Sequence, residues 1–275
     1  MDQNHTLSGY YKTSPSYIMV PRDIIYDVTL SDKRAIIFCY LYTRRAFDNT
    51  VAFSTTELCH WSKLNPNYRD GGINQKYYYT LSMMAKRGFF KSYPDFESLM
   101  QERTNSKTYR TLTVNPRKFN IDSNFGFIYY DELEKILNFK EELKDKGIDL
   151  SRISSSYILL LLAYLRINMN RNEGSPYCCY RLYTSIAGDI QISKRYIGKI
   201  VEILDALKIV KSVPCKRIKY ITYEGKEKHF TSPKVFTDYR RYVKDENGTS
   251  VIDIHHNPDV EIAKQLELLY SQTEN

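Results

Sequence analysis

Residues 192–208, ISKRYIGKIVEILDALK, are the stretch that decides the fold of this chain. On a helix they form one apolar face, because hydrophobic side chains recur at the i, i+3, i+4 and i+7 spacing. The members of that face are Ile197, Ile200, Val201, Leu204 and Leu207. The opposite face carries Arg195, Lys199 and Glu202, and Ser193 is placed to cap the first turn. The pattern predicts a helix that packs by one side and presents cations near its N-terminus on the other.

A basic, β-rich run over residues 209–222 follows this helix, and Tyr223-Glu224-Gly225-Lys226 after it is a turn signal. A further short strand over residues 229–236 would close a hairpin. A helix followed by a basic hairpin is the C-terminal half of a winged helix-turn-helix. The alternative is an amphipathic helix that happens to precede an unrelated hairpin.

The same pattern occurs earlier in the chain, displaced by 120 residues. Residues 73–92 repeat the arrangement seen after Ile192, with Tyr77, Leu81 and Met84 at the inward positions. Upstream, IIFCYL at residues 36–41 is similar to LLLAYL at residues 160–165. A period of this length is too long for a solenoid repeat and fits two domains of similar architecture.

We therefore predict a mainly α fold with small β wings (α+β), built from two tandem winged helix-turn-helix domains. The expected divisions are a flexible N-terminus at 1–16, a first winged-helix domain at 17–122, a second at 123–240, and an acidic C-terminal tail at 241–275. The tail contains a predicted helix over residues 259–270, with Ile262, Leu266 and Leu269 on one side. We expect this helix to pack back on the body or to make a dimer contact.

Composition favours a cytoplasmic protein without a membrane segment. The chain has 275 residues, of which 42% are hydrophobic and 26% charged, ordinary values for a globular protein that buries its own core. Its longest apolar run, residues 157–165, is far shorter than the ~20 residues that span a bilayer. The N-terminus has no apolar signal-peptide core, and the five cysteines form no CxxC pair.

Basic charge is concentrated away from the C-terminus. The chain carries 40 Lys and Arg against 32 Asp and Glu, a formal net charge of +8. Residues 235–275 hold four basic and eight acidic side chains, whereas residues 211–234 hold seven Lys or Arg against two Glu. A local positive excess raises the concentration of polyanions and is typical of nucleic-acid-binding surfaces.

Candidate DNA contacts lie first on the two repeated helices. In the later helix they are Lys194, Arg195 and Lys199, because a recognition helix places its N-terminal side chains at base edges and Arg reads guanine. The earlier helix offers polar side chains at corresponding places, of which Asn and Gln can pair with adenine. They are Asn74, Gln75, Lys76, Tyr79 and Lys86. The alternatives are a solvated face for the later helix and boundary aromatics for the earlier one.

The two hairpins supply further candidate contacts, to phosphates or to the minor groove. They are Lys216, Arg217, Lys219, Lys226 and Lys228 in the second hairpin, and Lys107 and Arg110 in the first, which is predicted to run over residues 89–93 and to return through residues 108–114. Singly, each of these is an ordinary surface cation. The prediction depends on their clustering.

The sequence offers little support for catalysis. Its 25 tyrosines raise the alternatives of base stacking on single-stranded DNA and of a tyrosine nucleophile in a DNA nickase, but Ile254-His255-His256 lacks the metal-site spacing that a nickase needs. Cys59-His60 and Cys178-Cys179 lack zinc-ligand spacing, and no GxxxxGK[ST] or GxGxxG motif occurs. We predict no enzyme activity, no metal and no cofactor, with buried thiols and with tyrosines as amphipathic core residues.

Two consecutive winged-helix units, preceded by Tyr17-Ile18-Met19-Val20-Pro21 and by Leu30-Ser31 before a long helix, resemble replication initiator proteins of plasmids and phages. The resemblance is architectural and spans residues 17–236. It implies a protein that binds double-stranded DNA at repeated origin sites, as a dimer or as a monomer, and recruits host replisome proteins. It transfers no catalytic residue. The alternatives are a winged-helix transcriptional regulator and an adaptor whose basic hairpin meets an acidic protein.

Overall fold

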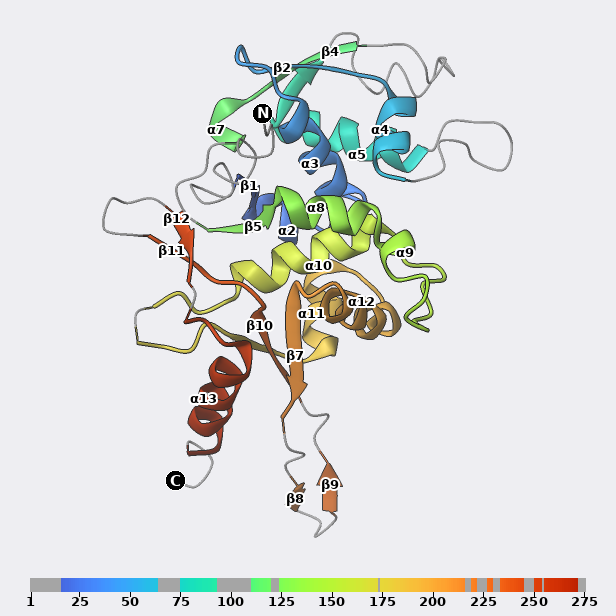
Figure 1. Ribbon diagram of the computed structural model, residues 1–275. Coiled ribbons are helices and arrows are strands. Elements are labelled where there is room, and N and C mark those ends of the chain that lie inside the picture. Colours follow the sequence, from blue (N-terminus) through green and yellow to red (C-terminus); the bar gives the residue numbers. More distant parts are fainter. Residues whose placement is uncertain are drawn as a thin grey trace, which may run out of the picture. The chain divides into compact units, whose positions relative to one another are not determined.

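The computed structural model of the chain describes residues 16–63, 75–92, 110–119, 124–172, 174–215, 219–221, 227–229, 233–244, 250–253 and 255–271 (Figure 1). These residues form two compact units. The N-terminal unit comprises residues 17–167 together with 189–192, and the C-terminal unit holds the other described residues, chiefly 168–188 and 193–271.

Helices and short strands alternate along the N-terminal unit. In order they are β1 (Tyr17–Pro21), α2 (Arg22–Tyr26), α3 (Arg34–Arg44), β2 (Thr50–Phe53), α4 (Thr55–Trp61), α5 (Gln75–Lys86), β3 (Phe90–Ser92), β4 (Arg110–Val114), α7 (Pro116–Phe119), β5 (Phe125–Tyr129), α8 (Tyr130–Leu137), α9 (Phe139–Glu142) and α10 (Ser155–Ile167). An antiparallel pair joins β1 to β5, and a second antiparallel sheet has the order β2-β4-β3. Figure 1 shows α3 between this sheet and the β1–β5 pair.

The helix α10 is the centre of the N-terminal unit. Its sequence, SSYILLLLAYLRI, is apolar on nearly every side, and every residue from Ser155 to Arg166 except Tyr157 is buried. A helix that is hydrophobic all round belongs inside a core. It packs against β5, α3 and α8, and the first two turns of α3 are equally buried.

One close approach fixes the spacing between α10 and β5. A Cβ atom added to Gly126 would lie 2.2 Å from the carbonyl oxygen of Ala163. That oxygen belongs to the main chain of α10, so it cannot rotate away. Glycine at this position therefore lets the strand lie directly against the helix backbone.

A buried ion pair ties α8 to α10. The guanidinium of Arg166 donates to Glu132 through two bonds, Nη1 to Oε2 at 2.5 Å and Nη2 to Oε1 at 2.7 Å. It also donates to the carbonyl of Phe127 at 3.0 Å and lies 4.7 Å from the centroid of that ring. Glu132 in turn accepts the main-chain N–H of Tyr129 at 3.3 Å, at the start of α8. Both charges are thus satisfied inside the core.

The C-terminal unit consists of a small sheet, a long hairpin and two long helices. Its elements are β6 (Cys179–Arg181), α11 (Tyr183–Ile190, whose last two residues join the N-terminal unit), α12 (Lys194–Ala206), β7 (Val210–Pro214), β8 (Lys219–Ile221), β9 (Glu227–His229), β10 (Lys234–Asp238), β11 (Tyr242–Lys244), β12 (Ser250–Ile252) and α13 (Pro258–Ser271). The sheet order is β6-β10-β7, with β8–β9 and β11–β12 as separate antiparallel pairs. The register is constant from Val210 opposite Asp238 to Lys219 opposite His229, so β7–β8 and β9–β10 are the two arms of one hairpin.

The two three-stranded sheets share strand order and register. Each sheet is antiparallel. The strand that comes last along the chain, β4 in the first sheet and β10 in the second, lies in the middle. In the first sheet Phe53 lies opposite Arg110, and in the second Arg181 lies opposite Lys234 at the corresponding place. The chain thus builds one local topology twice.

The helices α5 and α12 also end in the same way, 120 residues apart. Gly88 and Lys208 both have positive φ, at 75° and 57°. Their N–H groups bond to the carbonyls three residues back, at 2.8 and 2.9 Å, and the next N–H bonds five residues back in each case. This is the Schellman arrangement, and it ends both helices.

The structure confirms the α+β class with small antiparallel sheets, the helix within residues 192–208, the second hairpin and the terminal helix. The Ser193 cap is wrong, because its side chain makes no capping bond and its carbonyl accepts from Tyr196 and Ile197 instead. Within the N-terminal unit β5 pairs with β1 and α10 packs on α3, while the boundary between winged-helix domains at 122/123 stays a prediction. Residues 1–15 lie outside the described residues. No helix in the described part of the chain is long and apolar enough to cross a membrane.

Substituting Gly126→Ala should lower the free energy of unfolding by about 1–3 kcal/mol or more, because the new methyl overlaps the Ala163 carbonyl. The measurement is denaturant unfolding followed by circular dichroism. The control is Gly188→Ala in α11, where nothing lies within 4 Å of the added Cβ. It should be neutral or stabilising by about 0.5–1 kcal/mol. Equal stability of the two variants would contradict the close approach.

Substituting Glu132→Gln should destabilise the protein by about 3–5 kcal/mol, since it leaves the buried Arg166 without a counter-charge. The exposed Glu134→Gln on the same helix is the control and should change stability by less than about 0.5 kcal/mol. Replacing both partners, as Glu132→Leu with Arg166→Met, should cost less than the single change. A single variant that unfolds at the wild-type midpoint would refute this account of the ion pair.

Candidate nucleic-acid interface

The outward face of α12 carries the cations that the sequence predicts as DNA contacts. Lys194 and Arg195 open the helix and are exposed, and Lys199 on the next turn is half-buried. Among the described residues, neither Lys194 nor Arg195 forms an ion pair. The exposed carboxylate of Glu202 follows Arg195 two turns on. Because a helix N-terminus adds a partial positive charge of its own, this end of α12 attracts anions.

The inward face and the C-terminal end of α12 hold it firmly. Its buried residues are Ile197, Ile200, Val201, Ile203 and Leu204. At the far end, Lys208 Nζ donates to the Tyr239 hydroxyl at 3.3 Å, and that hydroxyl donates to the Asp205 carboxylate. Burial, and then the nearby Asp205, raise the pKa of Tyr239, so its hydroxyl stays a donor. The exposed cations therefore stand on a rigid element.

The predicted contacts of α5 are not free in the same way. Lys76 Nζ lies 3.5 Å from Asp32 Oδ1, and the Tyr79 hydroxyl donates to the carbonyl of Thr29 at 3.2 Å. Lys86 is exposed in the last turn, and Gln75 begins the helix, with only its backbone described. Asn74 lies outside the described residues.

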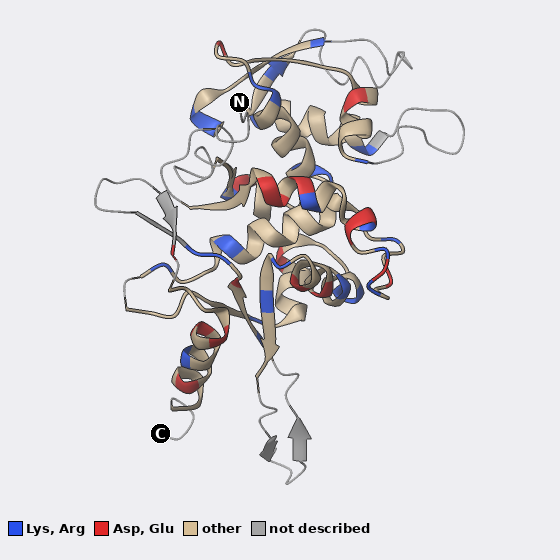
Figure 2. Ribbon diagram, in the orientation of Figure 1, with Lys and Arg blue, Asp and Glu red and all other residues tan. Residues whose placement is uncertain are grey.

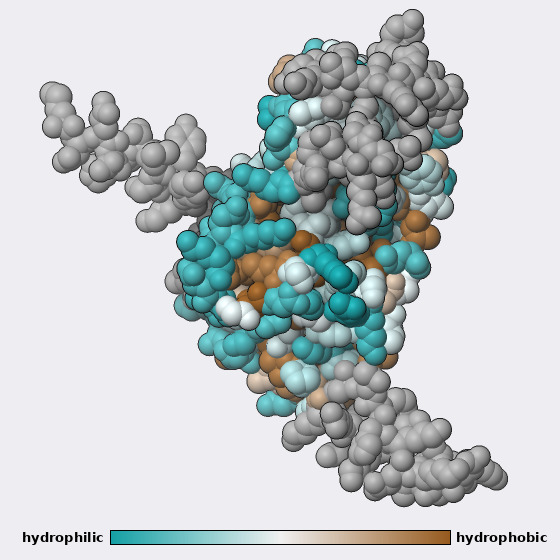
Figure 3. Space-filling view, turned by 90° about the vertical axis from the view of Figure 1, so that its right-hand side faces the viewer, coloured by the Kyte–Doolittle hydropathy of each residue, from teal (hydrophilic) through white to brown (hydrophobic). Residues whose placement is uncertain are grey.

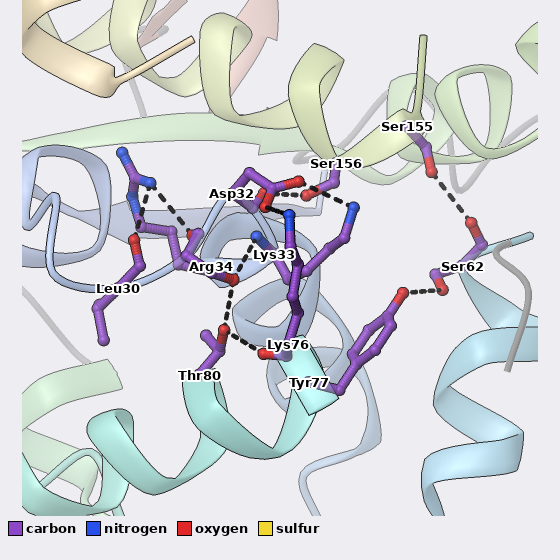
Figure 4. A network of polar contacts seen from close by, with 11 residues as sticks. Leu30, Asp32, Lys33, Arg34, Ser62, Lys76, Tyr77, Thr80, Ser155 and Ser156 are labelled. Carbon is purple, nitrogen blue, oxygen red and sulfur yellow. Dashed lines mark hydrogen bonds and ion pairs between the residues drawn. The ribbon is translucent and has the colours of Figure 1, made fainter. Parts of the chain in front are cut away.

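A polar network connects the start of α5 with the start of α3 (Figure 4). The Ser31 and Thr80 hydroxyls are 2.5 Å apart, and Ser31 Oγ also accepts the N–H of Lys33 at 3.1 Å. Asp32 pairs with Lys33 at 2.9 Å as well as with Lys76. Burial would raise the pKa of Asp32, but the two lysines outweigh it and the pKa is lowered. This carboxylate is therefore ionised at neutral pH.

The hairpin candidates are only partly placed. Lys219 and Lys228 lie on β8 and β9, the paired outer arms of the hairpin, where the backbone alone is described. Arg110 begins β4 opposite Phe53 and is half-buried. Lys107, Lys216, Arg217 and Lys226 lie outside the described residues. The predicted basic cluster at the hairpin remains a prediction.

Sequence reasoning missed the contact between the acidic terminal helix and the base of the second hairpin. Lys211 Nζ on β7 pairs with Asp259 at 2.6 Å, and Glu261 accepts the main-chain N–H of Tyr177 at 2.7 Å. The helix packs on the sheet through its predicted apolar side. The contact forms a buried apolar cluster of Cys178, Cys215, Val235 and Ile262, against which the partly buried Val213, Leu266 and Leu269 pack. The apolar periodicity predicted the helix, but no local sequence pattern predicted that its Asp259 pairs with Lys211.

The remaining chemistry-bearing groups are mostly enclosed. All five cysteines are free and buried, and burial raises their thiol pKa values, to about 11 for Cys59 and about 12 for Cys178. Such thiols are poor nucleophiles. Tyr40, Tyr77 and Tyr164 are fully buried, as expected of core tyrosines. In the described ranges no group of three or more His, Cys, Asp or Glu is placed to hold a metal ion.

The surface of the described residues mixes both charges with scattered apolar side chains. Figure 2 shows basic and acidic positions together on α12 and on α13. Figure 3 shows hydrophobic side chains between hydrophilic ones on one side of the molecule. Phe47, Tyr79 and Tyr130 are among the exposed large apolar residues, and isolated exposures of this kind are ordinary. Lys194 and Arg195, which form no ion pair among the described residues, are therefore the more informative feature.

Comparison with known proteins adds no functional assignment. No protein-family model matches the chain, and a search of curated proteins finds no significant match.

Proposed function

We propose that this chain is a sequence-specific double-stranded DNA-binding protein built on two winged helix-turn-helix domains. The observation that carries the proposal is the order helix, strand, helix, helix, strand, strand, which occurs twice with the same sheet order and register. The first series is α3, β2, α4, α5, β3 and β4, and the second is α10, β6, α11, α12, β7 and β10. In each series the fourth element is the candidate recognition helix.

The charge on α12 supports a role in reading DNA. Arg195 has the planar fork that matches the O6 and N7 acceptors of guanine, while Lys194 suits a phosphate. Glu202 can accept from the amino group of cytosine and repels phosphates that approach out of register. A face with free cations and one carboxylate can therefore favour a particular base sequence over bulk polyanion.

The tandem arrangement supports a replication role. Two DNA-binding domains in one chain suit repeated sites, such as those at a replication origin. In each domain the recognition helix, α5 or α12, would occupy a major groove. We infer that the protein is a replication initiator or replisome organiser of a plasmid or phage-like mobile element. It would act as a dimer or as a monomer on repeated sites, and would recruit host replisome proteins without catalysing a reaction itself.

The test is binding to duplex DNA that adjoins the chain's own coding sequence, titrated against random competitor from low to physiological salt. We expect competitor-resistant binding whose affinity falls steeply with salt, because several phosphate contacts release counterions. Lys194→Ala with Arg195→Ala should weaken binding by about tenfold or more and reduce the salt slope by about one or two.

The control is Lys144→Ala with Lys146→Ala, which removes two exposed lysines from the turn after α9. It changes the net charge equally and should leave affinity near the wild-type value. If both double variants lose affinity equally for every sequence, recognition by α12 is wrong. Transfer of replication to a plasmid carrying the bound DNA then separates an initiator from a transcriptional regulator. Absence of any specific binding would favour the adaptor.

A further inference from the structure

A short loop before α3 follows the side of α5 that faces out of the core. It comprises residues 27–33, and it contacts α5 at both ends. Near the start of the helix Asp32 pairs with Lys76 and Ser31 with Thr80, at 3.5 and 2.5 Å. Figure 4 shows Lys76 and Thr80 on α5 turned toward this loop. The contacts involve helix positions at i and i+4, which share one face.

At the other end of α5 the loop makes a second charged contact. Arg87 Nε lies 3.2 Å from Asp27 Oδ2, and Arg87 Nη2 donates to the Thr29 hydroxyl at 3.3 Å. Between the two ends, the hydroxyl of Tyr79 donates to the carbonyl of Thr29. The loop therefore places one carboxylate against a cation at each end of the helix.

The two carboxylates are fixed in place before any ligand arrives. Asp27 Oδ1 accepts the N–H of Thr29 at 3.0 Å and its hydroxyl at 2.5 Å, which closes an Asx turn. Asp32 is held by Lys33, and its carbonyl accepts a hydrogen bond from Ser156 on α10. The loop cannot move away without losing these contacts.

The ion pairs themselves are accessible and exchangeable. The side chains of Lys76 and Arg87 are 59% and 51% exposed, against 15% and 21% for Asp32 and Asp27. Solvated pairs of this kind are weak, so a phosphate can replace the carboxylate as the partner of either cation. On α12, by contrast, Lys194 and Arg195 have no carboxylate to displace among the described residues.

We propose that Asp27 and Asp32 are built-in competitors for DNA phosphates, which make α5 the weaker of the two reading helices. This inference rests on the proposed function, and it specifies how the two units divide the work. The α12 unit engages DNA first, and α5 engages only where the DNA offers phosphates well enough placed to displace both carboxylates. Such a device favours tandem sites over single ones, because the second contact becomes effectively intramolecular once the first is made.

The experiment measures binding of the full chain to a fluorescein-labelled duplex of mixed sequence by anisotropy, at fixed salt. Asp27→Asn with Asp32→Asn keeps the side-chain shape and the Asx-turn acceptor while removing both competing charges. We expect the affinity to rise by about three- to tenfold. In that background, Lys76→Gln with Arg87→Gln should abolish the gain, whereas the same two changes in the wild type should have a smaller effect.

The charge-matched control is Glu134→Gln with Glu141→Gln, two exposed acids on α8 and α9. It reports the gain expected from a less negative protein alone. The proposal is overturned if the aspartate variant gains no more than this control, or if its gain survives loss of Lys76 and Arg87. If the wild type binds the duplex but the aspartate variant binds no more tightly, the competitor role of Asp27 and Asp32 is refuted while the proposed function stands. Absence of duplex binding by the wild type and by every variant would sink the proposed function with it.

Discussion

The buried guanidinium of Arg34 organises the N-terminal unit around the start of α3. Only 1% of Arg34 is exposed, and all five of its hydrogen bonds go to main-chain carbonyl oxygens. Two of these carbonyls, those of Ile24 and Ile25, lie in the last turn of α2. A third, that of Ile190 at the end of α11, accepts from Arg34 Nη2 at 3.0 Å. Burial lowers the pKa of Arg34 to about 10, so it stays charged at neutral pH. A cation enclosed in this way must have every donor satisfied, and three separate chain segments converge because they supply the acceptors.

The duplicated topology persists although few letters are shared, because it depends on backbone geometry more than on identity. Gly88 meets the left-handed turn after α5 without steric cost, while Lys208 adopts the same turn after α12 with a positive φ that a side chain disfavours. The strain at Lys208, of the order of 1 kcal/mol, is opposed by its contact with Tyr239 and by the turn's hydrogen bonds. Glycine thus adopts this turn without strain, whereas lysine adopts it because other contacts offset the strain. For the same reason the two copies of this topology share little sequence identity.

Local patterns predicted the elements better than their partners. The apolar spacing of residues 192–208 predicted α12, which the structure places at Lys194–Ala206. The pairing of Tyr17–Pro21 with β5 was not predicted, because strand pairing is decided by contacts more than 100 residues apart that leave no local period. The buried ion pair of Arg166 with Glu132 was not predicted either, because a charged residue near a helix end is normally exposed. The spacing also predicted which face of α12 is exposed. It did not predict that Asp32 and Asp27 pair with Lys76 and Arg87 at the two ends of α5.

Net charge overstates the cations available to an anionic partner, and this limits what the value of +8 implies. Within the N-terminal unit, cations on several elements already have carboxylate partners. These pairs are Arg44–Glu57, Lys76–Asp32, Arg87–Asp27 and Lys118–Asp23. A phosphate that binds at such a site gains only the difference between two similar electrostatic contacts, whereas at Lys194 and Arg195 it replaces water and mobile ions. The position of unpaired charge on a rigid helix, rather than the total charge, therefore determines where this chain would attract a polyanion most strongly.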